Sequence, residues 1–481
     1  MSGMGDDRGV SVRGDAVRGD AVHDLIVVGG GPGGLSAALA AAQAGARVTL
    51  LDAYPEPGGQ YYHQPPERFL AEATPRQREG RALWQRAADA GVQVRSGVTV
   101  WNLDADKTLS LHGPGGVETV RARVVILATG AYERTAAFPG WTLPGVITSG
   151  AAQILLYGRV RPGRRVLLVG TGPLQLITAA ALLKAGAQVA AVLEGARLER
   201  GLGGLPAMFG QWGRIREGLA SMALLARHGV PYRAGWGILA AHGEREVEGA
   251  TIARLDRDWR PIPGSERAVS CDTICVGYGF APFNALAKLA GAAQEWRSEL
   301  GGEVPCRDEY MQTSIPGLYA VGDGAGVGGY RLALLEGQIA GLAAASALAG
   351  AAQGSGAERA GAASRAVMPA LRREQAFQRL YARLFTPGPG IYELARPETV
   401  LCRCEGVTLG QLEAAAREGV TTVREAKAAV RCGMGECQGR TCGAQVTHTL
   451  ARLAGKTVEE VGTYSARPPL FPIPIGSFQE E

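Results

Sequence analysis

Five of the eight cysteines in this 481-residue chain lie between Cys402 and Cys442. The stretch 402–404 reads CRC, and 32 residues separate Cys404 from Cys437 in the later stretch CGMGECQGRTC. Four thiolates on loops are typical ligands of zinc or of an iron–sulfur cluster. In a reducing compartment they favour a metal site over a disulfide framework. The spacing therefore predicts a metal centre held by Cys402, Cys404, Cys437 and Cys442, with free thiols as the alternative.

Short helices are expected to position these loops. A helix N-capped by Thr408 follows the first pair and ends near Gly419, and another helix follows Cys442. The module has about sixty residues, and a domain of that size usually needs a staple such as a metal. Cys432 is a fifth thiol that is able to replace one ligand. Cys271 and Cys275 flank a short strand and are expected to be separate buried thiols.

A glycine-rich turn near the start of the chain predicts a dinucleotide site. The sequence DLIVVGGGPGGLSAALAAAQAGARVTLLD reads as strand, helix and strand, with G-x-G-x-x-G at Gly29, Gly31 and Gly34 and an acid at Asp52. Such a turn lets the backbone approach a pyrophosphate at the helix N-terminus, and the acid accepts a hydrogen bond from a ribose hydroxyl. Because both strands, the helix and the acid are present, the motif is specific.

A second unit of the same kind starts with GRRVLLVGTGPLQ. Gly170 and Gly172 match the first two glycines and Glu194 matches the acid, but Gln175 stands where the third glycine would be. A side chain there interferes with close packing of the helix on the strand. The pattern thus leaves open whether this unit binds NAD(P) or is a purely structural Rossmann layer.

Later stretches identify the first dinucleotide as FAD by resemblance. ARVVILATG, which ends in Thr129 and Gly130, and GLYAVGDGAG, which contains Gly322 and Asp323, resemble signatures of the two-dinucleotide flavoproteins. In that family the aspartate binds the ribitol chain of FAD. The segment PGGQ at 57–60 resembles the loop beside the isoalloxazine ring.

Composition limits the remaining function classes. The net charge is +5 and no basic run with interleaved aromatic residues is present, which argues against nucleic-acid binding. No segment is apolar and long enough to predict a membrane span, and the first residues lack the apolar region of a signal peptide. We therefore expect a cytoplasmic protein with a disordered leader.

Taken together, GAYERTAAFPGWTLPGV and the cysteine module resemble the α (flavin) subunit of multi-subunit amino-acid dehydrogenases. That family includes subunits of opine oxidase, of hydroxyproline or proline dehydrogenase and of hydrogen cyanide synthase. The C-terminal module resembles the bacterioferritin-associated-ferredoxin-like [2Fe-2S] domain, so the resemblance favours a [2Fe-2S] cluster on the four cysteines named above. The motifs and the family together give this FAD-binding set: Gly29, Gly31, Gly33, Gly34, Asp52, Gly59, Gln60, Thr129, Gly130, Gly322 and Asp323.

The resemblance implies an α/β flavoprotein in which an NAD(P)-like Rossmann domain is inserted into an FAD domain, followed by a small helical [2Fe-2S] domain. The expected segments are a leader (1–23), the first half of the FAD domain (24–155), the inserted domain (156–264), the second half of the FAD domain (265–350), a helical linker (351–396), the cluster domain (397–462) and a Pro-rich tail (463–481).

The resemblance further implies an electron-transfer subunit of an enzyme that oxidises an amino acid or secondary amine. A flavin-containing β subunit would carry the substrate site, and some assemblies of this family add a small ferredoxin-like subunit. The sequence offers no convincing catalytic base. Two alternatives remain open: a self-sufficient NAD(P)H-dependent FAD/iron–sulfur oxidoreductase, and a non-redox protein with a structural zinc module.

Overall fold

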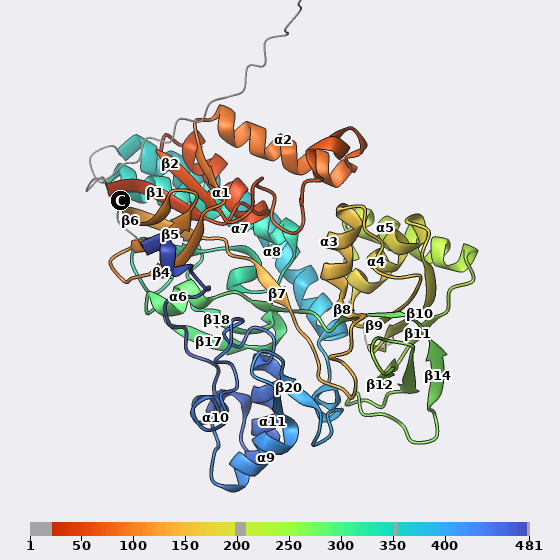
Figure 1. Cartoon of the computed structure of the whole chain (residues 1–481). Helices are drawn as coiled ribbons and strands as arrows, with labels where there is room; N and C mark the ends of the chain where they lie inside the picture. Colours follow the sequence, from red (N-terminus) through yellow and green to blue (C-terminus); the bar gives the residue numbers. More distant parts are fainter. Residues whose placement is uncertain (1–21, 198–207, 351–353, 479–481) are drawn as a thin grey trace, which may run out of the picture.

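The computed structural model describes residues 22–197, 208–350 and 354–478 (Figure 1). It confirms an α/β fold with two nucleotide-binding-type sheets and a small helical C-terminal module. The predicted leader lies almost entirely outside the described residues.

The FAD domain is built on a seven-stranded sheet of order β3-β2-β1-β6-β5-β4, with β19 paired to β6. Strands β2, β1, β6 and β19 are mutually parallel, and β2 is buried along its whole length, as expected for a strand covered on both faces. The strands are β1 (Val22–Val28), β2 (Val48–Asp52), β3 (Gln93–Ser96), β4 (Thr99–Leu103), β5 (Thr108–Gly113), β6 (Gly116–Leu127) and β19 (Leu318–Ala320). The helices of this domain are α1 (Pro32–Gln43), α2 (Pro75–Asp89), α6 (Ala285–Leu289) and α7 (Tyr330–Ala349).

Helix α7 is the core helix of this domain. The expectation that no segment is apolar and long enough to span a membrane is wrong for α7: within the described ranges it is the one helix whose length and composition would allow it, and half of that segment is buried inside the fold. It packs so closely on α1 that a Cβ added at Gly337 would lie 2.1 Å from the carbonyl oxygen of Gly33. Its apolar character is therefore explained by packing in the core.

The inserted unit contains a five-stranded parallel sheet of order β11-β10-β9-β15-β8. Two of these strands, β8 and β15, lie outside the predicted range 156–264. They belong to this sheet because β15 pairs in parallel with β9, and β8 pairs in parallel with β15. The strands are β8 (Val146–Thr148), β9 (Arg165–Gly170), β10 (Gln188–Glu194), β11 (Tyr232–Ala234) and β15 (Thr273–Gly277). The helices are α3 (Ser149–Tyr157), α4 (Pro173–Lys184) and α5 (Trp212–Arg227).

Smaller sheets join these two units. An antiparallel sheet extends the inserted unit with β12 (Trp236–His242), β13 (Gly249–Arg254) and β14 (Arg267–Ser270). Two further antiparallel pairs are β7 (Ala131–Glu133) with β16 (Phe280–Pro282), which are distant in sequence, and the hairpin of β17 (Gln294–Arg297) with β18 (Gly302–Pro305). Helix α8 (Gly354–Phe385), in the range predicted as a helical linker, then runs down the middle of the molecule (Figure 1).

The cysteine module consists of a two-stranded sheet and four helices. Its elements are β20 (Val400–Cys402), β21 (Val407–Thr408), α9 (Leu409–Arg417), α10 (Val423–Val430), α11 (Gly443–Ala454) and α12 (Val458–Val461). Thr408 caps α9 as predicted: its hydroxyl accepts from the Gln411 N–H, and the Gln411 side chain accepts from the Thr408 N–H.

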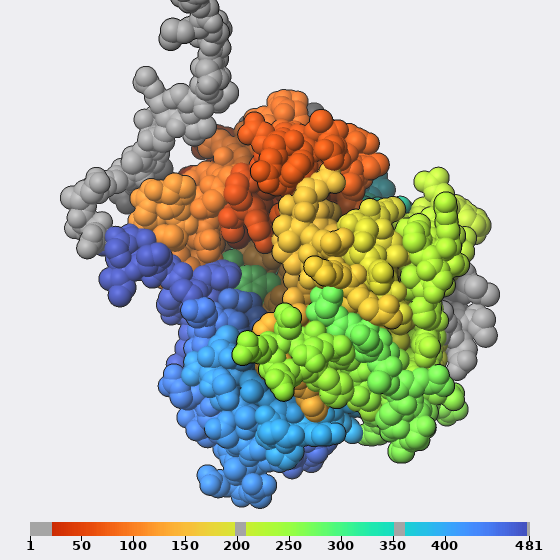
Figure 2. Space-filling view, turned by 45° about the vertical axis from the view of Figure 1, so that its right-hand side comes forward, coloured from red at the N-terminus to blue at the C-terminus, as the bar shows by residue number. Residues whose placement is uncertain are grey.

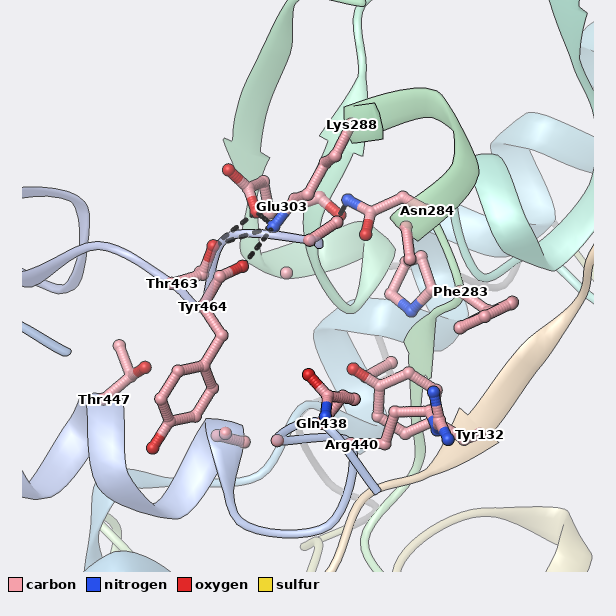
Figure 3. Close-up of a pocket in the computed structure, with 18 of the residues that line it drawn as sticks. Tyr132, Phe283, Asn284, Lys288, Glu303, Gln438, Arg440, Thr447, Thr463 and Tyr464 are labelled. Carbon is pink, nitrogen blue, oxygen red and sulfur yellow. Dashed lines mark hydrogen bonds and ion pairs between the residues drawn. The ribbon is translucent and has the colours of Figure 1, made fainter. Parts of the chain in front are cut away.

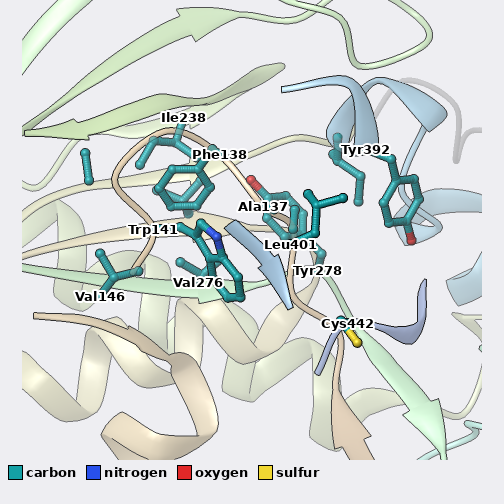
Figure 4. Close-up of a cluster of buried hydrophobic side chains, with 14 of the residues drawn as sticks. Ala137, Phe138, Trp141, Val146, Ile238, Val276, Tyr278, Tyr392, Leu401 and Cys442 are labelled. Carbon is teal, nitrogen blue, oxygen red and sulfur yellow. The ribbon is translucent and has the colours of Figure 1, made fainter. Parts of the chain in front are cut away.

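This module shares a hydrophobic core with the inserted unit. The cluster in Figure 4 joins Val276 and Ile238 of the inserted unit to Leu401 and Cys442 of the module through the segment around Trp141. Figure 2 shows the blue C-terminal region against the green part of the inserted unit, and Arg260 forms a two-pronged ion pair with Glu393, just before the module, at 2.8 and 2.9 Å. The module is therefore an integral component of the fold.

The Pro-rich tail packs back onto the FAD domain. Leu470 is buried in the core beneath β4, and its N–H donates to the Trp101 carbonyl at 3.1 Å. The Phe471 ring lies 5.7 Å from that of Phe283. The tail thus links the end of the cysteine module to the FAD domain.

Candidate flavin site and cysteine module

The predicted flavin-site residues gather at one edge of the FAD-domain sheet. Gly29 follows β1, Asp52 ends β2, Thr129 follows β6, and Gly322 follows β19. These strands are parallel, so their carboxyl ends meet at the same edge. Ligands of open α/β sheets bind at this edge.

The first glycine turn has the geometry that a pyrophosphate site requires. Gly29 has φ +102°, and a Cβ at Gly34 would lie 1.8 Å from the Gly29 carbonyl oxygen, so helix and strand pack too closely for a side chain. At Gly31, in contrast, a Cβ would have only the Cα of Gly59 within 4 Å, at 3.9 Å. Backbone is thus exposed at the N-terminus of α1, where phosphate groups bind favourably.

The Asp52 carboxylate links the glycine turn to the loop that follows β2. One carboxylate oxygen accepts from the Gly30 N–H and the other from the Tyr54 N–H, both at 2.9 Å. Burial raises the pKa of Asp52, and the two N–H donors oppose that shift. Gly30 was not predicted, although a Cβ there would lie 2.1 Å from the Asp52 carboxylate.

The turn after β6, with Thr129 and Gly130, and the turn after β19, with Gly322, lie against each other. A Cβ at Gly324 would lie 2.7 Å from the Thr129 hydroxyl oxygen and 3.0 Å from the Gly130 carbonyl oxygen. One Asp323 oxygen accepts from the N–H groups of Gly328 and Gly329 at 2.9 and 2.8 Å, and burial raises the pKa of this carboxyl. The aspartate is therefore fixed beside the start of α7.

The last two predicted residues differ in their placement. Gly33 lies inside the site: a Cβ added there would lie 3.4 Å from the side chain of Val321, the neighbour of Gly322. Gln60 lies at the exposed rim, where its amide donates to the Tyr54 hydroxyl at 2.6 Å. Sequence reasoning missed the support of Gly322: its N–H donates at 2.8 Å to Glu336, which is ion-paired with Arg307.

The second glycine turn is built differently. Gln175 is buried; its amide donates to the carbonyls of Val169 and Gly277 and its oxygen accepts from the Ser149 hydroxyl at 2.8 Å. Glu194 accepts from the Gly172 N–H at 2.8 Å, and burial raises its pKa to about 7. The Gln175 side chain therefore fills the space between the strand ends that a third glycine would leave.

The cysteines meet in two groups. The thiols of Cys432 and Cys442 hydrogen-bond to Cys402, which lowers the pKa of Cys402 to about 2, and Cys404 hydrogen-bonds to Cys437. Cys442 also lies 3.9 Å from the Tyr464 hydroxyl. Cys432, which was left out of the predicted ligand set, is fully buried and contacts Cys402 directly.

No group of three or more His, Cys, Asp or Glu side chains within residues 22–197, 208–350 and 354–478 is arranged to hold a metal ion. The structure therefore does not show the predicted [2Fe-2S] site. Its four cysteines lie as neighbouring thiols in two hydrogen-bonded groups, Cys402 with Cys442 and Cys432, and Cys404 with Cys437. Their chemistry still fits an iron–sulfur cluster, since four thiolates are its usual ligands.

A cavity of about 130 Å³ lies between the FAD-domain segments 281–288 and 301–303 and the loop 438–440 of the C-terminal module (Figure 3). Tyr132, Phe283 and Arg440 line one side of it, and the Arg440 guanidinium lies 5.6 Å from the centre of the Phe283 ring. On another side Lys288 is ion-paired with Glu303 and donates to the Thr463 hydroxyl at 2.9 Å. The cavity wall thus draws on both the FAD domain and the C-terminal module.

The fold and the flavin edge define a flavin-dependent oxidoreductase. Residues 23–353 match the family model described as pyridine nucleotide-disulphide oxidoreductase, and the chain belongs to that family. Residues 398–479 match the sarcosine oxidase A3 domain.

Relatives over nearly the whole chain place it more narrowly. It is 33% identical to hydrogen cyanide synthase subunit HcnB of Pseudomonas aeruginosa over 94% of this chain and 98% of that one. It is also 33% identical to an opine oxidase subunit of Agrobacterium tumefaciens over 94% of this chain and 90% of the other. The chain therefore belongs to this group of oxidoreductase subunits, and the predicted family is confirmed. The pyridine nucleotide-disulphide oxidoreductase family implies FAD, and the glycine turn fits that cofactor.

Solved structures show the same fold. L-proline dehydrogenase from P. horikoshii superposes with a TM-score of 0.68 at 19% identity, over 96% of this chain and 80% of that one. Thioredoxin reductase from T. acidophilum superposes with a TM-score of 0.51 at 20% identity, over 67% of this chain and 98% of the other.

Proposed function

We propose that this chain is the FAD- and [2Fe-2S]-containing electron-transfer subunit of a heteromeric enzyme that oxidises an amino acid or a secondary amine. The full-length likeness to subunits of opine oxidase and hydrogen cyanide synthase supports this proposal. FAD would supply the ability to accept two electrons and release them one at a time. The FAD would be held by the first glycine turn together with Asp52 and Asp323.

The contact between the cysteine loop and the segment that leaves the flavin edge carries the proposal. Strand β7 directly follows Gly130, and the Thr135 hydroxyl just beyond it donates to the Thr441 carbonyl at 3.1 Å. Tyr132 on β7 lies close enough to Cys437 and Cys442 for charges on them to influence its pKa, which burial raises. Because electron transfer slows steeply with distance, a cluster on this loop would be well placed to exchange electrons with the flavin.

The ligand set we propose for the cluster is the four cysteines predicted from spacing. Cys402 and Cys404 lie at the end of β20, and Cys437 and Cys442 lie on the loop before α11. Arg440, between the second pair, brings positive charge to this loop. That charge would partly offset the negative charge of four thiolates.

Metal analysis tests the cluster. We expect about two irons and two acid-labile sulfides per chain purified without oxygen, and a rhombic electron paramagnetic resonance signal after reduction with dithionite. Cys404→Ser should abolish iron and signal, whereas Cys306→Ser, remote in sequence from the module, should change neither. Zinc in place of iron would contradict the cluster, and loss of iron in Cys432→Ser but not in Cys404→Ser would assign a different ligand set.

Reduction of the flavin tests the relay. We expect the flavin absorption of the chain alone to remain unchanged when amino acids or secondary amines are added without oxygen. After the chain is co-expressed with a flavoprotein β subunit encoded beside it, a substrate of this class should bleach the band. Bleaching of the isolated chain by an amine would contradict the proposal, because the substrate site would then lie in this chain.

A further inference from the structure

The two glycine turns of this chain differ in what lies over them. In the first, a Cβ at Gly31 would have only backbone of Gly59 within 4 Å, at 3.9 Å. In the second, a Cβ at the matching Gly172 would lie 2.6 Å from the Tyr381 hydroxyl oxygen and 3.9 Å from the Phe385 ring. Gly172 is the N-cap of α4. The phenol of Tyr381 therefore lies on the helix N-terminus to which a pyrophosphate would bind.

Tyr381 is held in this position by its surroundings. Its ring lies 4.9 Å from that of Phe385, one helical turn further along α8. Burial raises its pKa, and the carboxylates of Glu194 and Asp323 add to that shift. The phenol is thus neutral and lies within electrostatic range of the acids of both nucleotide-type sites.

Helix α8 is fixed to both domains by residues on the same stripe. The Gln378 amide donates to the carbonyls of Glu299 and Val327 in the FAD domain at 2.7 and 3.2 Å. One turn earlier, Glu374 forms an ion pair with Arg214 of α5 at 2.8 Å. Positions 374, 378, 381 and 385 recur at helical spacing and so share one face. Moving this stretch of α8 off the turn would require its face to separate from both domains.

We propose that Tyr381 selects the electron donor of the FAD by closing the second dinucleotide turn, so that the pyrophosphate of NADH or NADPH is excluded. This inference rests on the proposed function and explains how a chain with two Rossmann units serves as a relay for a partner flavoprotein. Glu194 and the α4 N-terminus are retained in the fold, and the side chain of a linker helix covers that N-terminus.

Nucleotide binding to the FAD-loaded chain tests this inference without any turnover. Isothermal titration of the wild-type chain with NADH, NADPH and ADP-ribose should show no saturable binding up to millimolar concentration. Tyr381→Ala should bind ADP-ribose at least tenfold more tightly than wild type, and adenosine should bind no better, because only the pyrophosphate gains access. Tyr381→Phe retains the ring and should behave as wild type.

Three results would overturn the inference. They are saturable binding of NADH to the wild-type chain, equal binding by wild type and Tyr381→Ala, and no binding by a Tyr381→Ala variant that retains its FAD and melting temperature. If Tyr381→Ala does not fold, saturable binding of NADH to the wild-type chain still overturns the inference. Failure of the proposed relay function would give a different result. The flavin would then not be reduced by the partner subunit and its substrate, whereas the nucleotide binding constants measured here would be unchanged.

Discussion

The ion pair between Arg307 and Glu336 is expected to stabilise the flavin edge by an amount that mutation can reveal. Glu336 is 2% exposed and accepts from both terminal nitrogens of Arg307, at 3.0 and 3.2 Å, and from the Gly322 N–H at 2.8 Å. Glu336→Gln keeps the shape but leaves the arginine charge without its partner. Breaking a buried pair in this way costs about 3–5 kcal/mol.

The lower end of that range applies here. The Arg307 side chain is 15% exposed and keeps a hydrogen bond to the Ala320 carbonyl at 2.8 Å. We therefore expect a loss of about 3 kcal/mol. In a domain of this size that corresponds to a melting temperature lowered by roughly 6–12 °C.

Thermal release of the flavin, followed by its fluorescence, measures this effect. The matched control is Glu299→Gln, which breaks an ion pair with Arg297 at 2.7 Å whose side chains are 45% and 39% exposed. An exposed pair contributes about 0–1 kcal/mol, so the control should melt within roughly 3 °C of wild type. If Glu336→Gln melts no lower than Glu299→Gln, the buried pair does not stabilise the flavin edge.

Three further predictions concern single sites. Gly34→Ala should give a colourless chain because its Cβ would lie 1.8 Å from the Gly29 carbonyl oxygen, whereas Gly115→Ala, with no atom within 4 Å, should keep its FAD; absorbance at the flavin band decides. Leu470→Ala should destabilise the FAD domain by about 2–5 kcal/mol, since the side chain is buried; an unchanged melting temperature would contradict this. Burial raises the pKa of Glu194 from 4.5 to about 7, so the folded state binds the extra proton, and stability should fall as pH rises from about 4.5 to 7; Glu194→Gln should flatten that fall in thermal melts at pH 5, 6 and 7.

The local chemistry of the flavin edge could be predicted from the sequence. The positions of Gly29, Gly31, Gly34 and Asp52 follow from one strand–helix–strand unit, in which turn, helix and acid are neighbours along the chain. Such short-range patterns specify their own geometry. The structure brings these four residues together at the carboxyl-terminal edge of the sheet.

Pairing between distant segments could not be predicted in the same way. The strand at Thr273–Gly277 is apolar in the sequence, but nothing in its composition tells which of two sheets it joins. Tyr381 is one aromatic residue of an amphipathic helix, and only the docking of α8 places it on Gly172. The contact of Cys432 with Cys402 likewise depends on how α10 packs.

The core shared by the cysteine module and the inserted unit has a consequence for evolution and for engineering. A domain with its own core can be exchanged between chains as a cassette, because few contacts cross its boundary. Here Leu401 and Val446 of the module pack in one cluster with Phe138 and Trp141, and the Trp141 indole donates to the Val400 carbonyl at 2.6 Å. Substitutions on the two sides of this boundary therefore have to compensate each other, and recombination at the boundary between related chains would join surfaces that do not match.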